Sequence, residues 1–464
     1  MGTDQNEELT MRLTISNHVD IDEAPESLLQ KIQSTFTLKN PAYDAADKMG
    51  RWTGNLDEYL RFYSARGGTV TIPRGAMGLL LFFCKEMGIR YEIADRRRTL
   101  QEMDFTFAGI LKPYQQSAVK NILSRDFGVL QAPTGSGKTI MALAIIAARK
   151  QPALIIIHSV ELLNQWIERI ETFLNIQRAE IGQIGDGKMQ IREKITVGIV
   201  NSVYPIAPTL LRHHFGQIIV DECHRAPART FTEAVSSFDC QFMLGLSATP
   251  FRRDGLTKLI EWHLGRKVEI KPETLTDRDI IKDVQIITRK TDFVSDRDAS
   301  ESYSKVLSEL TEDESRNRLI VGDIVKEASN GGGVCLALSD RKDHCETIKA
   351  MLHDSGIGAD VLTGEVSNGE RKAIVERLSA GKVRVLIATG QLIGEGFDAK
   401  SLQTLFLVTP IKFDGRLTQY LGRVLRPAPG KDHATIYDYV DGNVGVLAAS
   451  ARARAKVYRQ IKGT

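Results

Sequence analysis

The chain has 464 residues, of which 42% are hydrophobic and 26% charged, and its formal net charge is only +3. This length exceeds one ordinary hydrophobic core, so two or three domains are expected, and the composition excludes disordered and fibrous classes. The small net charge predicts no global attraction to polyanions. Any such contact must therefore come from local patches of cations.

The cysteines and the N-terminal segment bear on the compartment. The 5 cysteines are odd in number and never spaced Cys-x-x-Cys, which argues against a disulfide framework and a zinc ribbon. The opening MGTDQNEELT is polar and acidic, unlike a signal peptide, and the chain contains no run of about 18 apolar residues. We therefore expect a cytoplasmic protein that makes no membrane contact.

Residues 1–104 mix strand-like and helix-like patterns. MRLTIS, TVTIP and YEIA have the composition of strands, whereas PESLLQKIQSTF and GAMGLLLFFCKEMG are helical in pattern, which predicts a small α+β domain. Trp52, Tyr59, Phe62 and Tyr63 interleave with arginines, as in a face on which bases stack. The spacing of the last three of these aromatics fits the core stripe of a helix better than a stacking face. Arg96–Arg98 is typical of a solvated linker or of a phosphate contact.

From about residue 127 to 250, short apolar runs rich in β-branched residues alternate with helical patterns, and the same rhythm returns from about 334 to 440. Continuous apolar strands with intervening helices indicate parallel sheets covered on both faces. The sequence therefore predicts two α/β domains. The polar stretch from 269 to 283 between them, which contains a proline, suits a connector or hinge.

A candidate phosphate loop follows the first of these apolar strands. The run Ala132-Pro133-Thr134-Gly135-Ser136-Gly137-Lys138-Thr139 then opens an apolar helix. Small residues let backbone N–H groups approach phosphates, and the helix N-terminus favours negative charge. We expect Lys138 to reach the β and γ phosphates and the Thr139 hydroxyl to bind Mg²⁺.

A pair of acids follows a later strand of the same domain. Asp221 and Glu222 begin the run Asp-Glu-Cys-His, at the edge where parallel sheets bind ligands. Asp221 can hold Mg²⁺ through its water shell, and Glu222 can orient or deprotonate the attacking water. Cys223 fits a small space-filling residue better than a metal ligand, because no further ligands stand at usable spacing.

Two further runs follow this Asp-Glu-Cys-His run, Ser247-Ala-Thr249 and Gln419-Tyr-Leu-Gly-Arg423-Val-Leu-Arg426. The ordered set resembles superfamily 2 helicases over about residues 108 to 440, and residues 111–115, 158–166 and 248–255 resemble the XPB-type repair helicases and UvsW-type phage recombination helicases. The resemblance implies two RecA-like motor domains in tandem, at 105–278 and 279–464, behind an accessory domain at 1–104.

The resemblance also implies roles for individual residues. Gln115 would read the adenine edge, Gly396 and Asp398 would face the nucleotide, and Arg423 and Arg426 would be arginine fingers. The residues that would couple the ATP site to movement are His224, Ser247, Thr249 and Gln419. For nucleic-acid contact the candidates are Ser159, Asn201, Ser202, Thr363, Gly364 and Thr389, although Ser and Thr after strands are also common caps and turn residues.

The motifs and the resemblance together predict an ATP- and Mg²⁺-dependent DNA helicase or translocase, and the resemblance alone implies movement from 3′ to 5′. We expect it to act as a monomer on single-stranded or branched DNA in recombination or repair. RNA is the alternative substrate, and the motor of a restriction or defence assembly is an alternative role that would need a protein partner. The turn from Phe251 to Gly255 fits either a strand-separating element or a plain surface turn.

The C-terminal segment carries a further basic run. After Asp441 the chain contains Arg452, Arg454, Lys456, Arg459 and Lys462 and no acid. A helix of this composition close to phosphate would steepen the salt dependence of DNA binding. The alternative is a solvated terminal helix with no ligand.

Overall fold

The computed structural model describes residues 10–133, 135–224, 228–248, 256–271, 283–297, 299–330, 333–390, 402–410 and 433–462, with single positions between 417 and 431. Contacts group the chain into two compact units: the first runs to Pro133 and from Gly137 to Lys271, and the second follows from Pro272. Outside the described residues lie most of the connector, the turn 251–255 and the predicted site residues Thr134, Thr249, Gly396, Asp398, Gln419, Arg423 and Arg426.

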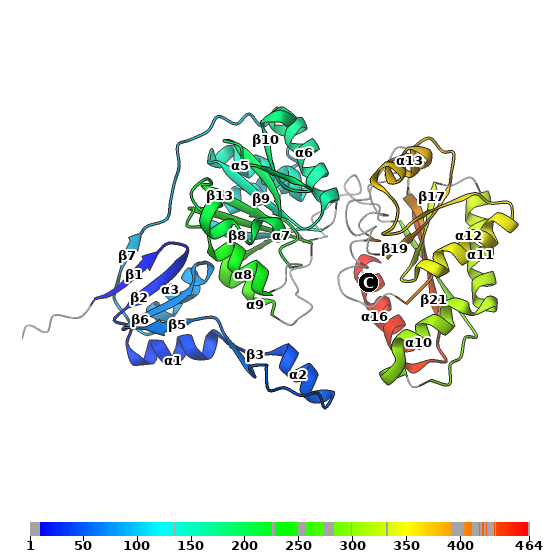
Figure 1. Ribbon diagram of the computed structural model, residues 1–464, viewed down its shortest axis with the longest axis horizontal. Helices are drawn as coiled ribbons and strands as arrows, with labels where there is room; N and C mark the ends of the chain where they lie inside the picture. Colours follow the sequence, from blue (N-terminus) through cyan, green and yellow to red (C-terminus); the bar gives the residue numbers. More distant parts are fainter. Residues whose placement is uncertain are drawn as a thin grey trace, which may run out of the picture. The chain divides into compact units, whose positions relative to one another are not determined.

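The N-terminal part is a small α+β domain built on a mixed sheet of order β5-β6-β2-β1-β7 (Figure 1). Its elements are β1 Met11–Ile15, β2 His18–Asp22, α1 Glu26–Thr35, β3 Thr37–Lys39, α2 Pro41–Lys48, β4 Tyr59–Arg61, β5 Ser64–Arg66, β6 Thr69–Pro73, α3 Met77–Glu86 and β7 Tyr91–Asp95. Strands β3 and β4 form a separate antiparallel pair. The expected mixture of helices and strands is present.

One expectation for this domain is wrong in part. Tyr59 lies in strand β4 and Phe62 and Tyr63 lie between β4 and β5, so the aromatic run is not helical, although Phe62 and Tyr63 do pack against the core. Strand β5 returns into β6 as an antiparallel hairpin with Arg66 opposite Thr69. The two residues between them, Gly67 and Gly68, have φ of +57° and +84°. A two-residue turn with both φ positive matches the twist of a hairpin, and glycine adopts it without strain. The hairpin that follows the aromatic run is therefore fixed by local turn chemistry.

The N-terminal domain shares a core with the first α/β domain. Trp262 packs against Phe36 and Phe62, with ring centroids 4.8 and 5.7 Å apart. The buried Arg74 guanidinium donates to Cys240 O at 2.7 Å and to Ser16 O at 3.3 Å. Because an unpaired buried guanidinium is costly, these bonds fix the seam between the domains.

The linker arginines reinforce this seam instead of lying free in solvent. Arg97 bonds to Asp126 at 2.7 Å and also pairs with Asp95, and Arg98 bonds to Asp239 at 3.0 Å. Arg97 and Arg98 are therefore held by carboxylates of the protein itself, and the expected solvated linker or phosphate contact is wrong for these two residues.

The first α/β domain is built on a sheet of order β11-β10-β12-β9-β13-β14-β8-β15, parallel throughout except for β11. Its strands are β8 Phe127–Gln131, β9 Ala153–Ile157, β10 Ile181–Gly185, β11 Lys188–Gln190, β12 Ile195–Ile199, β13 Gln217–Val220, β14 Phe242–Ser247 and β15 Lys267–Glu269. The central strands are buried along their length, as the apolar runs predicted.

Helices lie along both faces of this sheet (Figure 1). They are α4 Pro113–Leu123, α5 Lys138–Arg149, α6 Val160–Leu174, α7 Val200–Val203, α8 Ala228–Ser236 and α9 Lys258–Leu264. Helices α4, α5 and α6 pack in succession. A hydrophobic core joins α7, α8 and α9 to the strands. This doubly covered parallel sheet brings the carboxyl ends of β8, β9, β13 and β14 to one edge.

The second unit has an all-parallel sheet of order β16-β21-β20-β17-β19-β18. Its strands are β16 Val284–Lys290, β17 Val334–Ser339, β18 Ala359–Leu362, β19 Val385–Thr389, β20 Leu402–Leu407 and β21 Ala434–Val440. The helices are α10 Ala299–Glu312, α11 Glu314–Ser329, α12 Lys342–Asp354, α13 Asn368–Ser379 and α16 Gly445–Lys462. Two cores, one with α13 and α16 and one with α11 and α12, cover the two faces of the sheet.

A buried histidine makes the second unit sensitive to acid. His344 is 2% exposed, its Nε2 lies 2.9 Å from Asn317 Oδ1 and its Nδ1 lies 3.0 Å from Ser339 Oγ. Asn317 donates its amide to Thr311 O, so its oxygen faces the histidine and accepts from Nε2–H. Burial, assisted by the nearby Arg316, lowers the pKa of His344 from 6.5 to about 3. The imidazole is therefore neutral in the folded protein.

We expect the second unit to lose stability as the pH falls below 6.5. In the unfolded chain the His344 imidazole binds a proton at such pH, whereas in the folded protein it stays neutral. One such group lowers the free energy of unfolding by about 1.4 kcal/mol per pH unit between the folded and the unfolded pKa values. At a pH above both pKa values it has no effect. The His344→Gln variant should show a correspondingly flatter pH dependence in hydrogen exchange of the second unit. Identical slopes for the wild type and the variant would contradict a neutral buried His344.

Among the residues that the structure describes, none of the helices is both long and apolar enough to cross a membrane. All of the cysteines are buried and unpaired with one another.

Candidate active site

The loop between β8 and α5 has the backbone shape of a phosphate cradle. Gly135 and Gly137 have φ of +89° and +83°, in the left-handed region that favours glycine. A Cβ on Gly137 would lie 2.5 Å from the Gln115 amide nitrogen, so a larger residue would displace the Gln115 side chain in addition to straining the backbone. Lys138 Nζ donates to Ala132 O at 3.0 Å and to Pro133 O at 3.4 Å. The loop thus holds an ammonium group beside the first turn of an apolar helix.

The acid pair lies directly after β13. Asp221 is 7% exposed and accepts a hydrogen bond from Trp166 Nε1 at 2.8 Å. Its other oxygen accepts from Glu222 N at 2.9 Å. Burial and the neighbouring Glu222 raise the pKa of Asp221 from 3.8 to about 6. Lys138 and Trp166 act in the opposite direction by favouring the anion.

Glu222 has a strained backbone. Its φ of +45° is uncommon for a residue with a side chain. The strain is maintained by its backbone bonds, since the Glu222 carbonyl accepts from His158 Nε2 at 3.1 Å and its N–H bonds to Asp221. Strain of this kind costs about 1–3 kcal/mol and clusters at functional sites. The conformation places Glu222 Oε2 3.4 Å from His224 Nδ1.

The chemistry of this donor set fits a divalent cation. A bound Mg²⁺ would offset the burial of Asp221 and the repulsion between the two carboxylates. Thr139, in the first turn of α5, supplies a hydroxyl, and oxygen ligands are those that Mg²⁺ prefers. Among the described residues no group of three His, Cys, Asp or Glu could form a metal cage. A site with few protein ligands is what Mg²⁺ uses when phosphates and water complete its shell.

A hydrogen-bond chain connects the acid pair to the phosphate loop. His224 Nδ1 lies 2.9 Å from Ser247 Oγ, and Ser247 O accepts from Ala132 N at 3.0 Å. Ser247 ends β14, the strand between β13 and β8, and is fully buried. The predicted coupling residues His224 and Ser247 are therefore in direct contact.

Trp166 is a site residue that we did not predict. It lies on the buried face of α6, 55 positions before Asp221 in the sequence, and its ring is 1% exposed. The sequence did contain a signal for this role, because Trp166 stands in an apolar helical stripe and a buried indole N–H requires a hydrogen-bond acceptor. Its bond orients the Asp221 carboxylate.

We expect Trp166→Phe to lower ATP turnover by about 10- to 100-fold, as loss of partners that orient metal ligands does elsewhere. Phenylalanine keeps the apolar packing but leaves Asp221 without its indole donor. The measurement is ATPase rate against Mg²⁺ concentration, with Trp52→Phe as the control because Trp52 is 77% exposed. A Mg²⁺ dependence like that of the wild type would show that Trp166 has no positioning role.

The predicted adenine reader, Gln115, is placed against the loop. Its side chain is buried, accepts from Lys112 N at 2.9 Å and packs its amide nitrogen over Gly137. It therefore closes the first turn of α4 and contacts the phosphate loop. Its role toward adenine stays a prediction.

The predicted nucleic-acid contacts of the first unit follow the ends of β9 and β12. Ser159 is the N-cap of α6 and accepts from Leu162 N at 3.4 Å, which is the capping role named as its alternative. Asn201 and Ser202 lie in α7, where Asn201 is exposed. In the second unit, Thr363 and Gly364 follow β18 and Thr389 ends β19. Each group thus lies at the carboxyl edge of its own sheet.

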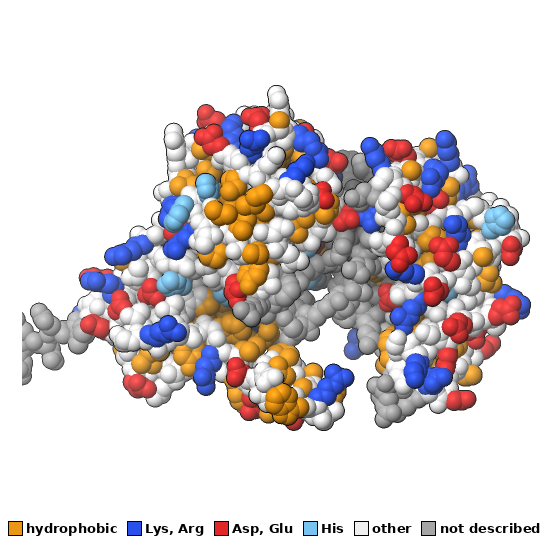
Figure 2. All heavy atoms as spheres, in the orientation of Figure 1, with side chains coloured by type: hydrophobic (Ala, Val, Ile, Leu, Met, Phe, Trp, Pro, Cys, Tyr) orange, Lys and Arg blue, Asp and Glu red, His pale blue; other side chains and the backbone are white. Residues whose placement is uncertain are grey.

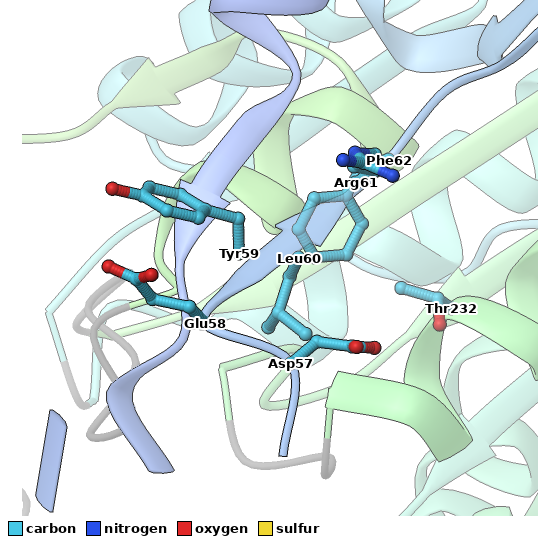
Figure 3. A pocket seen from close by; sticks show the side chains of 7 residues that line it. All are labelled: Asp57, Glu58, Tyr59, Leu60, Arg61, Phe62 and Thr232. Atoms are coloured by element: carbon cyan, nitrogen blue, oxygen red, sulfur yellow. The ribbon is translucent and has the colours of Figure 1, made fainter. Parts of the chain in front are cut away.

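The segment around α2 and β4 forms an exposed apolar surface. Met49, Trp52, Leu56 and Tyr59 are 65%, 77%, 37% and 50% exposed. Figure 2 shows hydrophobic side chains gathered over the part that carries α2. A pocket next to it, drawn in Figure 3, has a volume of about 640 Å³ and is lined by residues 57–62 and by Thr232 of α8. The carboxylates of Asp57 and Glu58 line this pocket, and their negative charge disfavours the binding of a polyanion there.

The fold and the site together define a P-loop nucleotide hydrolase: a phosphate cradle, a lysine and an acid pair at the carboxyl edge of a parallel sheet. Two family models match the chain, the type III restriction enzyme res subunit over residues 109–252 and the helicase conserved C-terminal domain over residues 317–428. The chain is a helicase of superfamily 2 and an ATPase, similar to the XPB and UvsW helicases.

Curated relatives support this assignment. The ATP-dependent DNA helicase uvsW of Enterobacteria phage T4 is 24% identical over 95% of this chain and 92% of its own length. The DNA 3′-5′ translocase XPB2 of Sulfurisphaera tokodaii is 27% identical over 68% and 78%. A putative ATP-dependent RNA helicase, L396 of Acanthamoeba polyphaga mimivirus, is 26% identical over 77% and 69%.

A solved structure agrees with the fold. The helicase domain of Hef from Pyrococcus furiosus matches 74% of this chain and 98% of its own with a TM-score of 0.51 and 15% identity. The expected class, two RecA-like parallel-sheet domains behind a small α+β domain, is confirmed.

Proposed function

We propose that this chain is an ATP-driven DNA helicase or translocase that moves 3′ to 5′ and processes forks or junctions in recombination or repair. The observation that carries the proposal is the match to uvsW, which extends over 95% of the chain and so includes the accessory domain as well as both motor domains. The direction of movement follows the 3′-5′ translocase named above. Single-stranded or branched DNA is then the substrate.

The nucleotide would be held by the first motor domain. Backbone N–H groups of the loop from Pro133 to Gly137 bind the phosphates, and Lys138 moves from the loop carbonyls to the β and γ phosphates. Mg²⁺, held by Thr139 and the water shell of Asp221, would neutralise charge on the phosphates. Glu222 orients the attacking water and accepts its proton. The His224–Ser247 contact reports the state of this site to the loop.

The roles of the second motor domain rest on the sequence alone. Arg423 and Arg426 would stabilise charge on the transferred phosphoryl group, and Gly396, Asp398 and Gln419 would complete nucleotide binding and coupling. Thr249 would act with Ser247. Strand contacts by residues such as Asn201 in one domain and Thr389 in the other would then turn ATP cycles into steps.

Steady-state ATPase rates with single-stranded DNA, duplex DNA, forked DNA and RNA, measured side by side, test the substrate. We expect stimulation by DNA, with the fork strongest, and unwinding from a 3′ single-stranded tail but not from a 5′ tail. Stimulation by RNA alone would reject the DNA proposal.

Two alternatives have their own support. RNA unwinding is suggested by the name of the mimivirus relative, and RNA-only stimulation would favour it. A motor role in a restriction assembly is suggested by the description of the first family model, and it requires a separate cutting subunit. ATPase activity that needs a partner protein as well as DNA would favour that role.

A further inference from the structure

Helix α16 is anchored to the second unit by one face. Val457 and Tyr458 join the core that covers the sheet, and Arg454 is 1% exposed. Arg454 Nη2 lies 2.7 Å from Asp438 Oδ1, and its Nε donates to both carboxylate oxygens at 3.0 and 3.1 Å. Arg454 is therefore a structural residue. Our prediction that grouped it with the other basic residues of the tail as a DNA contact is wrong, because its charge is satisfied inside the fold.

The opposite face of α16 presents cations to solvent. Arg452, Lys456 and Arg459 are exposed, and their spacing of four and three residues puts them on one stripe. At about 1.5 Å per residue they span about 10.5 Å of helix axis. The other exposed residues between Gly445 and Arg459 are glycine and alanines, so this stripe has no large apolar side chain.

The charge of this stripe is not offset within its own helix. Helix α16 contains no acid, and the preceding acids are occupied: Asp438 by Arg454, and Asp441 by Arg316 and Thr291. Within the described part of the chain, none of the three stripe cations forms an ion pair. Other exposed cations of the same unit do, as in the pairs Arg318–Glu314, Lys342–Glu365 and Lys349–Glu346.

We propose that the stripe of Arg452, Lys456 and Arg459 binds backbone phosphates of DNA, outside the catalytic motifs. The three charges extend over about 10.5 Å of helix axis, which corresponds to about three phosphate spacings of about 3.4 Å along one strand, so each cation can reach a different phosphate. Protein interfaces usually centre on large side chains buried in pockets, and the stripe has no large apolar side chain, whereas phosphates require only cations. The proposal rests on DNA being the substrate. It adds a sequence-independent contact that strengthens attachment during translocation.

The test is a titration of the full-length protein with a labelled DNA duplex at several salt concentrations. The stripe variant carries Arg452→Gln, Lys456→Gln and Arg459→Gln. The matched control carries Arg318→Gln, Lys342→Gln and Lys349→Gln, which removes the same charge from the same unit but only from paired cations. A third variant, with Arg452→Lys, Lys456→Arg and Arg459→Lys, keeps the charge and changes the side chains.

The stripe variant should flatten log K against log salt by up to about 2.7 units, since each phosphate contact contributes about 0.9. Its affinity for all duplex sequences should fall on the order of tenfold or more at low salt. The control and the charge-keeping variant should retain the slope of the wild type, and all variants should retain DNA-saturated ATPase.

Three results would overturn the proposal: a wild-type slope in the stripe variant, equal flattening in the control, or flattening in the charge-keeping variant. The first result would mean that the stripe serves solubility and does not contact DNA. The second would mean that the salt dependence reflects the overall charge of the unit, and the third that the side chains act through packing. A wild-type protein that binds no DNA at all would instead overturn the proposed function, and the stripe proposal with it.

Discussion

Glu222→Gln is expected to abolish most ATP turnover while ATP still binds. A positioned general base contributes about 10²- to 10⁴-fold, so the rate should fall within that range. Glutamine has nearly the same shape as glutamate but cannot accept the proton. The backbone of residue 222 should keep its strained shape, because its bonds to His158 and Asp221 use main-chain atoms of that residue.

The measurement pairs single-turnover hydrolysis with equilibrium binding of a fluorescent ATP analogue. Glu168→Gln is the matched control, since Glu168 is an exposed acid of α6 and its loss changes the net charge equally. This control should hydrolyse ATP at the rate of the wild type. If Glu222→Gln did so too, another group would have to activate the water. If the variant failed to bind nucleotide, Glu222 would have a binding role.

The elements that the sequence predicted correctly are those set by local patterns. Continuous apolar runs of β-branched residues identified β9, β12 and β13, and the small residues of the phosphate loop identified the bend at Gly137. In both cases the constraint lies within a few neighbouring residues. A buried parallel strand needs apolar side chains on both faces, and a left-handed backbone needs glycine.

The missed features depend on contacts between distant residues. Arg74 meets Cys240 from 166 positions away, and nothing near Arg74 indicates that its charge is buried. The tail is a different case, because a signal existed there. Helical spacing puts Arg452, Lys456 and Arg459 on one face and Arg454 on the other, with Val457 on the buried side. Our prediction counted the charges of the tail without their helical spacing, and it therefore did not separate Arg454 from the three exposed cations.

A second large effect is expected in the second unit, where a buried ion pair connects α11 to the end of β21. Arg316 and Asp441 are each 1% exposed, and Arg316 Nε donates to Asp441 Oδ1 at 2.8 Å. Arg316 Nη1 also donates to Val408 O at 2.7 Å, and the Thr291 hydroxyl donates to Asp441 at 2.6 Å. Every part of this network is hydrogen-bonded, so removing one partner leaves the others without compensation.

Arg316→Ala should therefore destabilise the second unit by about 3–5 kcal/mol, because the buried Asp441 carboxylate loses its counter-charge. Arg318→Ala, two positions further along the same helix, should cost at most about 1 kcal/mol, because its partner Glu314 is solvent-exposed. Amide hydrogen exchange of β20 and β21 during urea unfolding measures the effect. Tryptophan fluorescence is an internal reference, since Trp52, Trp166 and Trp262 all lie in the first unit and should report an unchanged transition. Equal losses for Arg316→Ala and Arg318→Ala would show that the buried pair contributes no more than a surface pair.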